Sequence, residues 1–556
     1  MSVFDYRRRA SREVNIGGIP LGGDNPVRVQ SMTNTSTMDT EGSVAQSKRI
    51  ADAGAHYVRL TAQGVREAEN IGKIRGLLRE TGCNVPLVAD IHFNPRAAFA
   101  AAEVTDKVRI NPGNFVDPGR TFRKLEYTDA EYAAELDRID KAFTPFLEVC
   151  RQHGTVIRIG VNHGSLSDRI MSRYGDTPAG MVESAMEFLR VAVKREFFNI
   201  VISIKASNVV VMVETVRRLV KAMEAENMTF PLHLGVTEAG DGEDGRVKSA
   251  VGIGTLLAEG TGDTIRVSLS EAPEAEIPVA KALVDYISHR ATAEPIEGEY
   301  ADGYNPVIPG RLATKAVGNI GGDNAPVVIA EGETLLEDYL LLDAAKPLND
   351  NIAIAKANPD KVLAVTTSHV NRPASIQALA HSLQRHGIKN PVIPMIDYGN
   401  ATIEDVTLMA AADFGAMLLN GLRDGIWIKG DRLDNDDVVR ISLGILQATR
   451  LRISKTEYIA CPGCGRTLFD LQSTLKAVKE ATSHLKGLKI GVMGCIVNGP
   501  GEMADADYGY VGAASGHISL YKNKECVEKN IPQSEAIPRL IALIKASGDW
   551  HDPATL

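Results

Sequence analysis

The chain has 556 residues, a net charge of −9, 44% hydrophobic residues and 24% charged residues. These values are typical of a folded protein of several domains and exclude a largely disordered chain. The negative charge disfavours nucleic-acid binding, and no apolar run approaches the roughly 20 residues that span a bilayer, so we expect neither partner. The N-terminal segment lacks the apolar stretch of a signal peptide, which favours a cytoplasmic protein.

Eight short runs rich in β-forming residues lie between residues 27 and 270, at 27–32, 57–61, 86–93, 107–113, 156–162, 199–207, 231–239 and 263–270. The segments between them have the apolar spacing of amphipathic helices, for example Arg66–Thr81, Gly180–Arg195, Val209–Glu226 and Arg246–Glu259. Eight βα units in about 250 residues predict an α/β fold of the (β/α)₈ TIM-barrel type. A doubly wound open sheet is the rival fold with the same alternation.

Polar and charged side chains stand at the ends of these runs, where a barrel would point them into its mouth. Five cations occupy corresponding positions, namely Arg59, Arg109, Arg158, Lys205 and Arg266. Buried charges cost several kcal/mol unless they are paired or solvated, so the pattern predicts a positive pocket for a compact polyanion. The alternative is a set of structural ion pairs with Asp90, Glu238 or Asp263.

About 150 residues separate the barrel pattern from a cysteine-containing C-terminal segment. This insertion reads as α/β, with strand-like runs at 361–368, 390–398 and 425–430. Its opening, GGDNAPVVIAE (321–331), resembles GGDNPVRVQ (22–30) of the barrel, which indicates a shrunken barrel-like repeat or a chance turn. We expect domains at 1–291 (barrel), 292–444 (inserted α/β domain) and 445–556 (α+β cluster domain).

Six cysteines in a chain without a secretory signal favour thiolate chemistry over disulfides. Cys461 and Cys464 form a CPGC motif and Cys495 follows 31 residues later, so the three can chelate one metal centre. Structural zinc, a redox disulfide and an iron–sulfur cluster are all compatible with this spacing. A tight glycine-rich turn at 498–502 brings Glu502 near Cys495 as a candidate fourth ligand of a cluster.

The motifs together resemble the 4-hydroxy-3-methylbut-2-enyl diphosphate synthase family. The resemblance lies in the barrel motifs VQSMTNT (29–35), ADIHF (89–93), RINPGN (109–114), IRIGVNHGSL (157–166), IKASN (204–208), GVTEAG (235–240) and GDTIRVSLS (262–270). It continues in CPGCGRTLFDLQ (461–472) and GCIVNGPGEMADADYGYVG (494–512). The long insertion resembles the three-domain form of the family.

The resemblance implies a 4Fe-4S cluster on Cys461, Cys464, Cys495 and Glu502, and it implies 2-C-methyl-erythritol 2,4-cyclodiphosphate as substrate. Two electrons from reduced ferredoxin or flavodoxin would open the cyclic diphosphate and expel a hydroxyl as water. Glu502 and Glu238 are the expected catalytic groups. The expected substrate-binding residues are Arg59, Asp90, His92, Arg109, Asn111, Arg158, Asn162, Lys205, Ser207, Thr237, Arg266 and Ser268. We also expect a homodimer.

Two other classes of function remain compatible with the residues alone. One is a barrel hydrolase or lyase with a structural zinc, in which Asp90, His92 and Glu238 perform acid–base chemistry. The other is a metal-containing sensor that binds a phosphorylated metabolite without turnover. Iron content after anaerobic purification distinguishes the iron–sulfur enzyme from the zinc enzyme, and turnover distinguishes both enzymes from the sensor.

Overall fold

The structure is a computed structural model that describes residues 3–117, 126–496 and 499–553. Within these ranges no helix is both long and apolar enough to cross a membrane. The chain divides into two compact units. One contains residues 10–245, 262–281 and 455–556, and the other contains residues 1–9, 246–261 and 282–454. The three-domain division expected from the sequence remains a prediction. Asn498, the first residue of the turn expected at 498–502, lies outside the described ranges.

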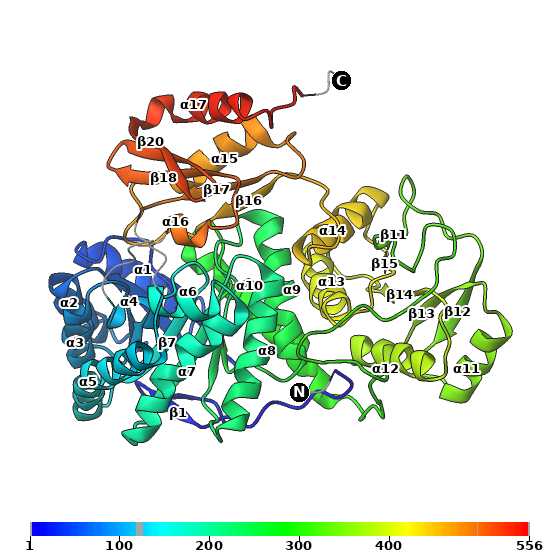
Figure 1. Ribbon diagram of the computed structural model, residues 1–556, viewed down its shortest axis with the longest axis horizontal. Coiled ribbons are helices and arrows are strands. Elements are labelled where there is room, and N and C mark those ends of the chain that lie inside the picture. The colour runs from blue at the N-terminus through cyan, green and yellow to red at the C-terminus, as the bar shows by residue number, and fades with distance from the viewer. Residues whose placement is uncertain (1–2, 118–125, 497–498, 554–556) are drawn as a thin grey trace. The chain divides into compact units, whose positions relative to one another are not determined.

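The first unit contains a closed, parallel eight-stranded barrel, which confirms the expected fold and excludes the open sheet (Figure 1). Its strands, in chain order, are β3 (Arg28–Met32), β4 (Tyr57–Ala62), β5 (Leu87–Ile91), β6 (Lys107–Ile110), β7 (Val156–Asn162), β8 (Ile200–Lys205), β9 (Leu232–Leu234) and β10 (Thr264–Ile265). The last strand pairs with the first through Thr264 and Arg28, which closes the barrel. Each strand therefore ends at the same rim as its neighbours.

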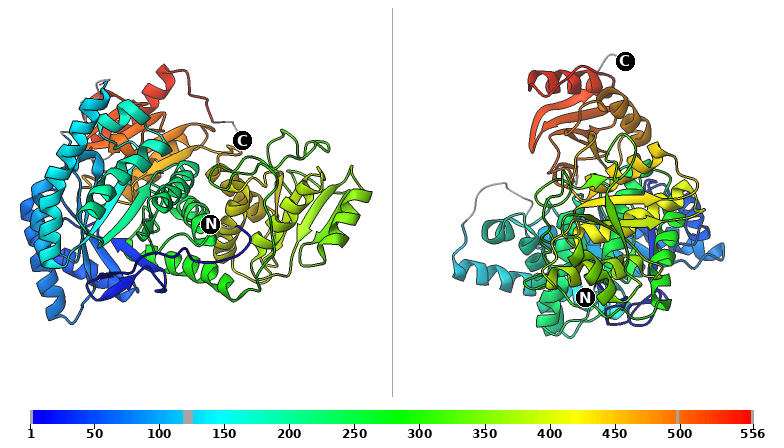
Figure 2. Two further views of the ribbon diagram at one scale, coloured as in Figure 1. Left: turned by 60° about the horizontal axis from the view of Figure 1, so that its bottom comes forward. Right: turned by 90° about the vertical axis from the view of Figure 1, so that its right-hand side faces the viewer.

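Helices follow the barrel strands, as the alternating pattern predicts (Figure 2). They are α1 (Thr40–Asp52), α2 (Val65–Glu80), α3 (Pro95–Val104), α4 (Pro112–Phe115), α5 (Asp129–His153), α6 (Asp168–Tyr174), α7 (Pro178–Lys194), α8 (Val209–Ala225), α9 (Gly242–Ala258) and α10 (Glu276–Ser288), with 3₁₀ turns η1 (Pro273–Ala275) and η2 (His289–Thr292). Helix α8 shows why such segments are helical. Asn208 caps its first amides, and its apolar residues recur on one buried face.

A small hairpin closes the bottom of the barrel, opposite the strand ends. It consists of β1 (Val14–Ile16) and β2 (Ile19–Leu21). Val14, Ile16 and Leu21 form one apolar core with Tyr57 and Val88 and their neighbours at the strand starts. This core leaves the opposite end of the strands for the site.

The C-terminal module is a five-stranded mixed sheet in the order β16–β17–β18–β19–β20 (Figure 1). Its elements are β16 (Glu457–Ala460), α15 (Leu471–Thr482), β17 (Lys489–Met493), α16 (Gly499–Glu502), β18 (Tyr508–Ala514), β19 (His517–Lys522), β20 (Glu525–Pro532) and α17 (Gln533–Ala546). Alternate strand residues such as Ile490 and Tyr510 pack against α15 and α17. Ile459 and Met493 face the other side and pack on Met503. The cysteine loops leave β16 and β17 at the same end of the sheet.

The second unit contains an all-parallel five-stranded sheet in the order β11–β15–β14–β13–β12. Its elements are β11 (Val327–Val328), β12 (Tyr339–Asp343), α11 (Leu348–Ala357), β13 (Val362–Thr366), α12 (Arg372–Arg385), β14 (Val392–Asp397), α13 (Ile403–Leu419), β15 (Gly425–Lys429) and α14 (Asn435–Ala448). Three of these strands were expected from the sequence, whereas β11 and β12 were not. The sheet resembles part of a barrel that is left open between its first and second strands.

Helix α13 packs closely against α9 within this unit. A Cβ atom on Gly254 would lie 2.9 Å from the Cβ of Ala412, and one on Gly415 would lie 3.0 Å from Val251. Asp413 is fully buried beside this contact and accepts hydrogen bonds from Arg290 Nη2 and Tyr286 Oη, each at 2.6 Å. Glycine on both helices thus permits a close approach that a buried ion pair reinforces.

The barrel closes through a specific set of hydrogen bonds around one aspartate. Asp263, at the start of the last strand, accepts from Ser11 Oγ at 2.7 Å and from the Leu232 amide at 2.8 Å. Its carbonyl accepts from the Arg28 amide at 2.9 Å, and Ser11 Oγ accepts from the Gly23 amide at 3.2 Å.

The inserted sheet repeats this arrangement. Asp424 accepts from Thr314 Oγ1 at 3.0 Å and from the Val392 amide at 2.9 Å. Its carbonyl accepts from the Val327 amide at 3.1 Å, and Thr314 Oγ1 accepts from the Gly322 amide at 3.2 Å. The GGDN similarity is therefore part of a shared framework and not a chance turn.

The ligand-bearing positions differ between the two copies. With Asp263 aligned to Asp424, Arg266 corresponds to Trp427. The Ile202 and Leu363 amides each donate to the carbonyl of a proline at 2.9 Å, which aligns Lys205 with Thr366. The inserted domain has kept the barrel's framework without these pocket cations.

Candidate functional site

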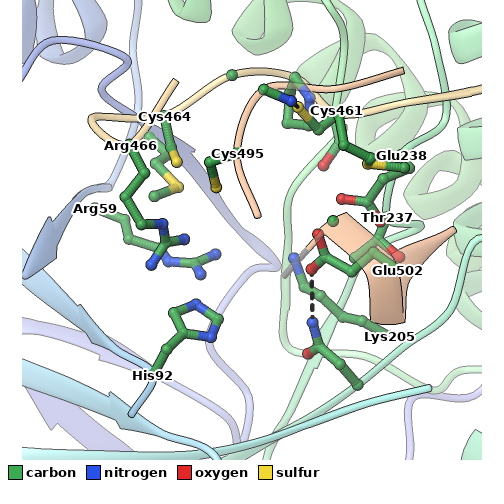
Figure 3. Close-up of a pocket in the computed structure, with 18 of the residues that line it drawn as sticks. Arg59, His92, Lys205, Thr237, Glu238, Cys461, Cys464, Arg466, Cys495 and Glu502 are labelled. Atoms are coloured by element: carbon green, nitrogen blue, oxygen red, sulfur yellow. Dashed lines mark hydrogen bonds between the residues drawn. The ribbon is translucent and has the colours of Figure 1, made fainter. Parts of the chain in front are cut away.

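A pocket lies at the carboxyl ends of the barrel strands and is completed by the C-terminal module (Figure 3). The expected site residues that line it are Arg59, His92, Arg109, Arg158, Asn162, Lys205, Thr237, Glu238, Arg266, Ser268, Cys461, Cys464, Cys495 and Glu502. Asp90, Asn111 and Ser207 are buried but are not among the residues lining the pocket. Asn111 instead caps α4, because its Oδ1 accepts from the Gly113 amide at 3.1 Å. The pocket is also lined by Met32, Ser203, Arg466 and Thr467, which were not expected from the sequence.

Asp90 is the buried hub of the pocket's arginines. Its carboxylate lies 2.5 Å from Arg59 Nη2, 3.4 Å from Arg109 Nη1 and 3.9 Å from Arg158 Nη2. Burial alone would raise the pKa of Asp90, but Arg59, His92 and Arg109 lower it well below its usual value. Asp90 therefore stays ionised and holds the guanidinium groups in place.

His92 connects this hub to the pocket surface. Its Nε2 lies 2.9 Å from both Asp90 Oδ2 and Arg109 Nη1, and its Nδ1 lies 3.0 Å from the same arginine nitrogen. Burial lowers the pKa of His92 well below its usual value, and Arg109 adds to this, although Asp90 opposes it. A neutral ring with the proton on Nε2 satisfies both neighbours, because Nδ1 can then accept from the arginine.

One carboxylate does not neutralise these cations. Within the described part of the chain, Arg59 Nε, Arg109 Nε and both Nε and Nη1 of Arg158 have no hydrogen-bond partner. Burial, followed by the charges of Arg59 and Arg158, lowers the pKa of Lys205 well below its usual value. Buried donors without partners are costly, so the pocket is built for an anionic ligand with several acceptor oxygens.

Arg266 has a counterion of its own. Its Nη2 donates to Glu276 Oε1 at 2.9 Å and its Nε donates to Glu276 Oε2 at 3.1 Å. Ser31 Oγ also donates to Glu276 Oε2, at 2.6 Å. The structural ion-pair alternative therefore describes part of the site, with Glu276 as a partner that the sequence analysis did not identify.

Glu238 and Glu502 form a carboxyl pair on the opposite side of the pocket from Arg59 (Figure 3). Glu238 has a φ of 51°, a left-handed conformation that is uncommon for a residue with a side chain. Burial, followed by the charge of Glu502, raises the pKa of Glu238 well above its usual value. Asn162 Nδ2 donates to Glu502 Oε1 at 3.0 Å. The raised pKa favours the protonated form of Glu238, which lies beside an oriented second carboxyl group.

Cys461, Cys464 and Cys495 line this same pocket (Figure 3). Within the described ranges, however, no three Cys, His, Asp or Glu side chains converge closely enough to hold one metal ion as they stand. In Figure 3 the Cys464 and Cys495 sulfurs lie on the side of Arg466, while Cys461 lies nearer Glu238. Three thiols and a carboxyl that line one cavity are a suitable donor set for an iron–sulfur cluster, and ligation by these residues remains a prediction.

The segment that carries Glu502 is a short helix, α16, and not the tight turn expected from its glycines. Pro500 explains the difference, because its fixed φ suits the first turn of a helix and its missing N–H costs nothing there. The helix aims Glu502 at the pocket.

The C-terminal module contacts the barrel of its own chain at the pocket's edge. Ala239 and Ala460 form a parallel β-bridge beside Glu238 and Cys461. Ser270 Oγ donates to the carbonyl of Cys461 at 2.9 Å. A single chain therefore supplies both walls of the site.

Gly164 lies at a close approach of the barrel and the C-terminal module. Its φ is +79°, and a Cβ atom there would lie 2.1 Å from the carbonyl oxygen of Gly501, next to Glu502. We expect Gly164→Ala to displace α16 and to lower turnover at least about tenfold, since small misplacements of reacting groups have effects of that size. Turnover and iron content on one preparation test this, and iron should be retained.

Gly154→Ala is the matched control for this variant. Gly154 also has a positive φ, +68°, but a Cβ atom there would meet nothing within 4 Å. It carries the same backbone penalty of roughly 1 kcal/mol without the clash. Equal turnover of the two variants would contradict the role of the Gly164 contact.

The fold and the pocket define a (β/α)₈-barrel protein whose mouth is completed by a cysteine-bearing C-terminal module. Residues 11–281 match the GcpE TIM-barrel domain, and residues 457–546 match the GcpE protein C-terminal domain. The chain is 56% identical to a 4-hydroxy-3-methylbut-2-en-1-yl diphosphate synthase (flavodoxin) of Bacteroides fragilis, over 99% of this chain and 98% of the relative. A protein of the same name from Leptospira interrogans is 40% identical to the chain, over 99% of this chain and 98% of the relative. The chain belongs to the GcpE family.

Proposed function

We propose that this chain converts 2-C-methyl-D-erythritol 2,4-cyclodiphosphate to (E)-4-hydroxy-3-methylbut-2-enyl diphosphate, a step of isoprenoid precursor biosynthesis. The observation that carries the proposal is the pocket itself, where unpartnered arginine donors face the same cavity as three cysteines and a carboxyl pair. Relatives of this name align over nearly the whole chain. The reaction takes up two electrons, opens the cyclic diphosphate and releases one hydroxyl as water.

Cys461, Cys464, Cys495 and Glu502 are the proposed holders of a 4Fe-4S cluster, which would supply electrons one at a time to the substrate carbon framework. Flavodoxin, named for the relatives, is the proposed electron donor, with ferredoxin as the alternative. Location in the cytoplasm and assembly as a homodimer remain predictions.

The side chains of the barrel bind and orient the substrate in this proposal. Arg59, Arg109, Arg158, Lys205 and Arg266 hold the diphosphate, while Asp90 and His92 keep the arginines in position. Asn162, Thr237 and Ser268 hold the remaining hydroxyl and phosphate oxygens. Glu238 lines the pocket and its pKa is raised, so it is the group that would give a proton to a departing oxygen.

Anaerobic turnover of the cyclodiphosphate with a low-potential reductant tests the function directly. Purified without oxygen, the protein should be brown, contain about four irons per chain and release the open-chain diphosphate. A colourless zinc protein, or an iron protein that leaves the cyclodiphosphate intact, would contradict the proposal.

Replacing Arg109 by alanine should weaken binding of the cyclodiphosphate about 10- to 100-fold, because each charge-assisted phosphate contact contributes about 1.5–3 kcal/mol. Calorimetric titration measures the affinity, and iron content should be unchanged. Arg109→Ala leaves Asp90 paired with Arg59 at 2.5 Å, whereas alanine at 266 would strand the buried Glu276 carboxylate. Wild-type affinity in Arg109→Ala would remove the anion-pocket argument.

A further inference from the structure

Arg466 is a pocket-lining arginine that the C-terminal module supplies, whereas Arg59, Arg109, Arg158 and Arg266 come from barrel strands and their ends. Its side chain is only 6% exposed. A buried guanidinium at the mouth of a barrel requires an explanation, because its desolvation costs several kcal/mol unless acceptors replace the lost water.

The loop that carries Arg466 is firmly held. The Cys464 amide donates to Thr467 Oγ1 at 3.0 Å, and the Thr467 amide donates back to the Cys464 carbonyl at 2.9 Å. The Leu468 amide donates to the Gly494 carbonyl at 3.0 Å, which ties this loop to the residue before Cys495. Arg466 therefore projects from a fixed turn between the two cysteine loops.

The acceptors around Arg466 are insufficient for its five donors. Its Nη2 lies 3.7 Å from Asp90 Oδ2, an oxygen that already receives Arg59 at 2.5 Å and His92 at 2.9 Å. Its Nε has no hydrogen-bond partner among the described residues. A guanidinium stays charged in proteins, so Arg466 remains a cation that needs acceptors.

We propose that Arg466 is a diphosphate ligand contributed by the cysteine module, which completes the anion site that the barrel arginines begin. The inference rests on the proposed function, since it assigns a residue to the same substrate. Arg466 lies beside Arg59 and His92 on one side and beside the Cys464 and Cys495 thiols on the other (Figure 3). It is thus placed to contact the bound anion and the cysteine site at once.

Two properties follow from this position. Loss of Arg466 should weaken anion binding, because a charge-assisted contact disappears. It should also lower the midpoint potential of the cluster, because removing a nearby positive charge disfavours the added electron. Loss of Arg59, whose guanidinium pairs with Asp90 at 2.5 Å and lies beside that of Arg466 in Figure 3, should also weaken anion binding.

Anaerobic titration of the iron-loaded protein with inorganic pyrophosphate, together with potentiometry, tests the proposal. We expect Arg466→Ala to bind pyrophosphate about 10- to 100-fold more weakly and to show the lowered potential. Arg466→Lys should recover part of the affinity, since it keeps the charge without the guanidinium fork. Lys476→Ala is the matched control, because Lys476 is a 79% exposed cation of the same module, and it should match the wild type.

Wild-type pyrophosphate affinity in Arg466→Ala would overturn the assignment of Arg466 while leaving the barrel pocket in place. If the wild-type protein itself failed to bind pyrophosphate, both the proposed anion site and the assignment of Arg466 to it would be wrong. If a variant binds less iron, the pyrophosphate affinities of the wild type and the variant are compared on metal-free protein, so that a difference in iron content does not affect the result.

Discussion

Cys461→Ser, Cys464→Ser and Cys495→Ser should each lose most of the bound iron and essentially all turnover. The three thiols line one cavity, and serine oxygen is a poor substitute for a thiolate at an iron–sulfur centre. The variants should still fold, because each cysteine lies in a loop and none is fully buried. Iron content and visible absorbance after anaerobic purification measure the loss.

Cys526→Ser is the control for these variants. Cys526 lies on β20 and donates a weak hydrogen bond from Sγ to the Glu528 carbonyl at 3.6 Å, apart from the pocket-lining residues. It should keep its iron and its turnover. If Cys526→Ser lost the metal while one of the other three retained it, the proposed ligand set would be wrong.

The barrel could be predicted from the sequence because its strands and helices have clear local signals. Buried strands such as Val156–Asn162 are short, rich in β-branched residues and separated by helices of amphipathic spacing. The polar residues at the strand ends could be assigned to one rim for the same reason, since parallel strands end together. Most of the expected binding residues accordingly line one pocket.

The pairing of these residues could not be predicted, because it depends on side chains distant in sequence. Glu276 lies on a helix after the last strand, yet it binds Arg266. Arg466 lies in a cysteine loop nearly 400 residues after Asp90, its nearest carboxylate. The one local signal for Arg466 was its place directly beside the CPGC motif, where a cation has an electrostatic reason to be.

The inserted domain shows the limit of short-range patterns. Its second strand, Tyr339–Asp343, has the sequence YLLLD and lies at the edge of the sheet with an irregular burial pattern. Such a short apolar run cannot be told from a helix segment by periodicity alone. The GGDN similarity could be seen in the sequence, but it did not distinguish a repeat from a chance turn. The equivalent hydrogen bonds of Asp263 and Asp424 show that it belongs to a structural repeat. Trp427 and Thr366 stand where the barrel has Arg266 and Lys205, so the repeat lacks these two pocket cations.

Glu502→Gln should retain iron on the three cysteines and bind pyrophosphate normally, yet lose turnover by about 100-fold or more, the range typical of a lost acid–base group. The amide oxygen can still accept from Asn162, so the packing of α16 is preserved. What disappears is an ionisable group next to Glu238. Iron content, pyrophosphate affinity and rate on a single preparation separate this effect from a loss of structure.

The pH dependence adds a second measurement to this variant. Glu238 has its pKa raised first by burial and then by the charge of Glu502. Removing that charge should lower the pKa of Glu238, so the residual rate should fall at a lower pH than in the wild type as Glu238 loses its proton. Asp505→Asn is the matched control, since Asp505 follows Glu502 by three residues without lining the pocket. Wild-type turnover in Glu502→Gln would rule out the catalytic role, and equal losses in both variants would indicate a structural one.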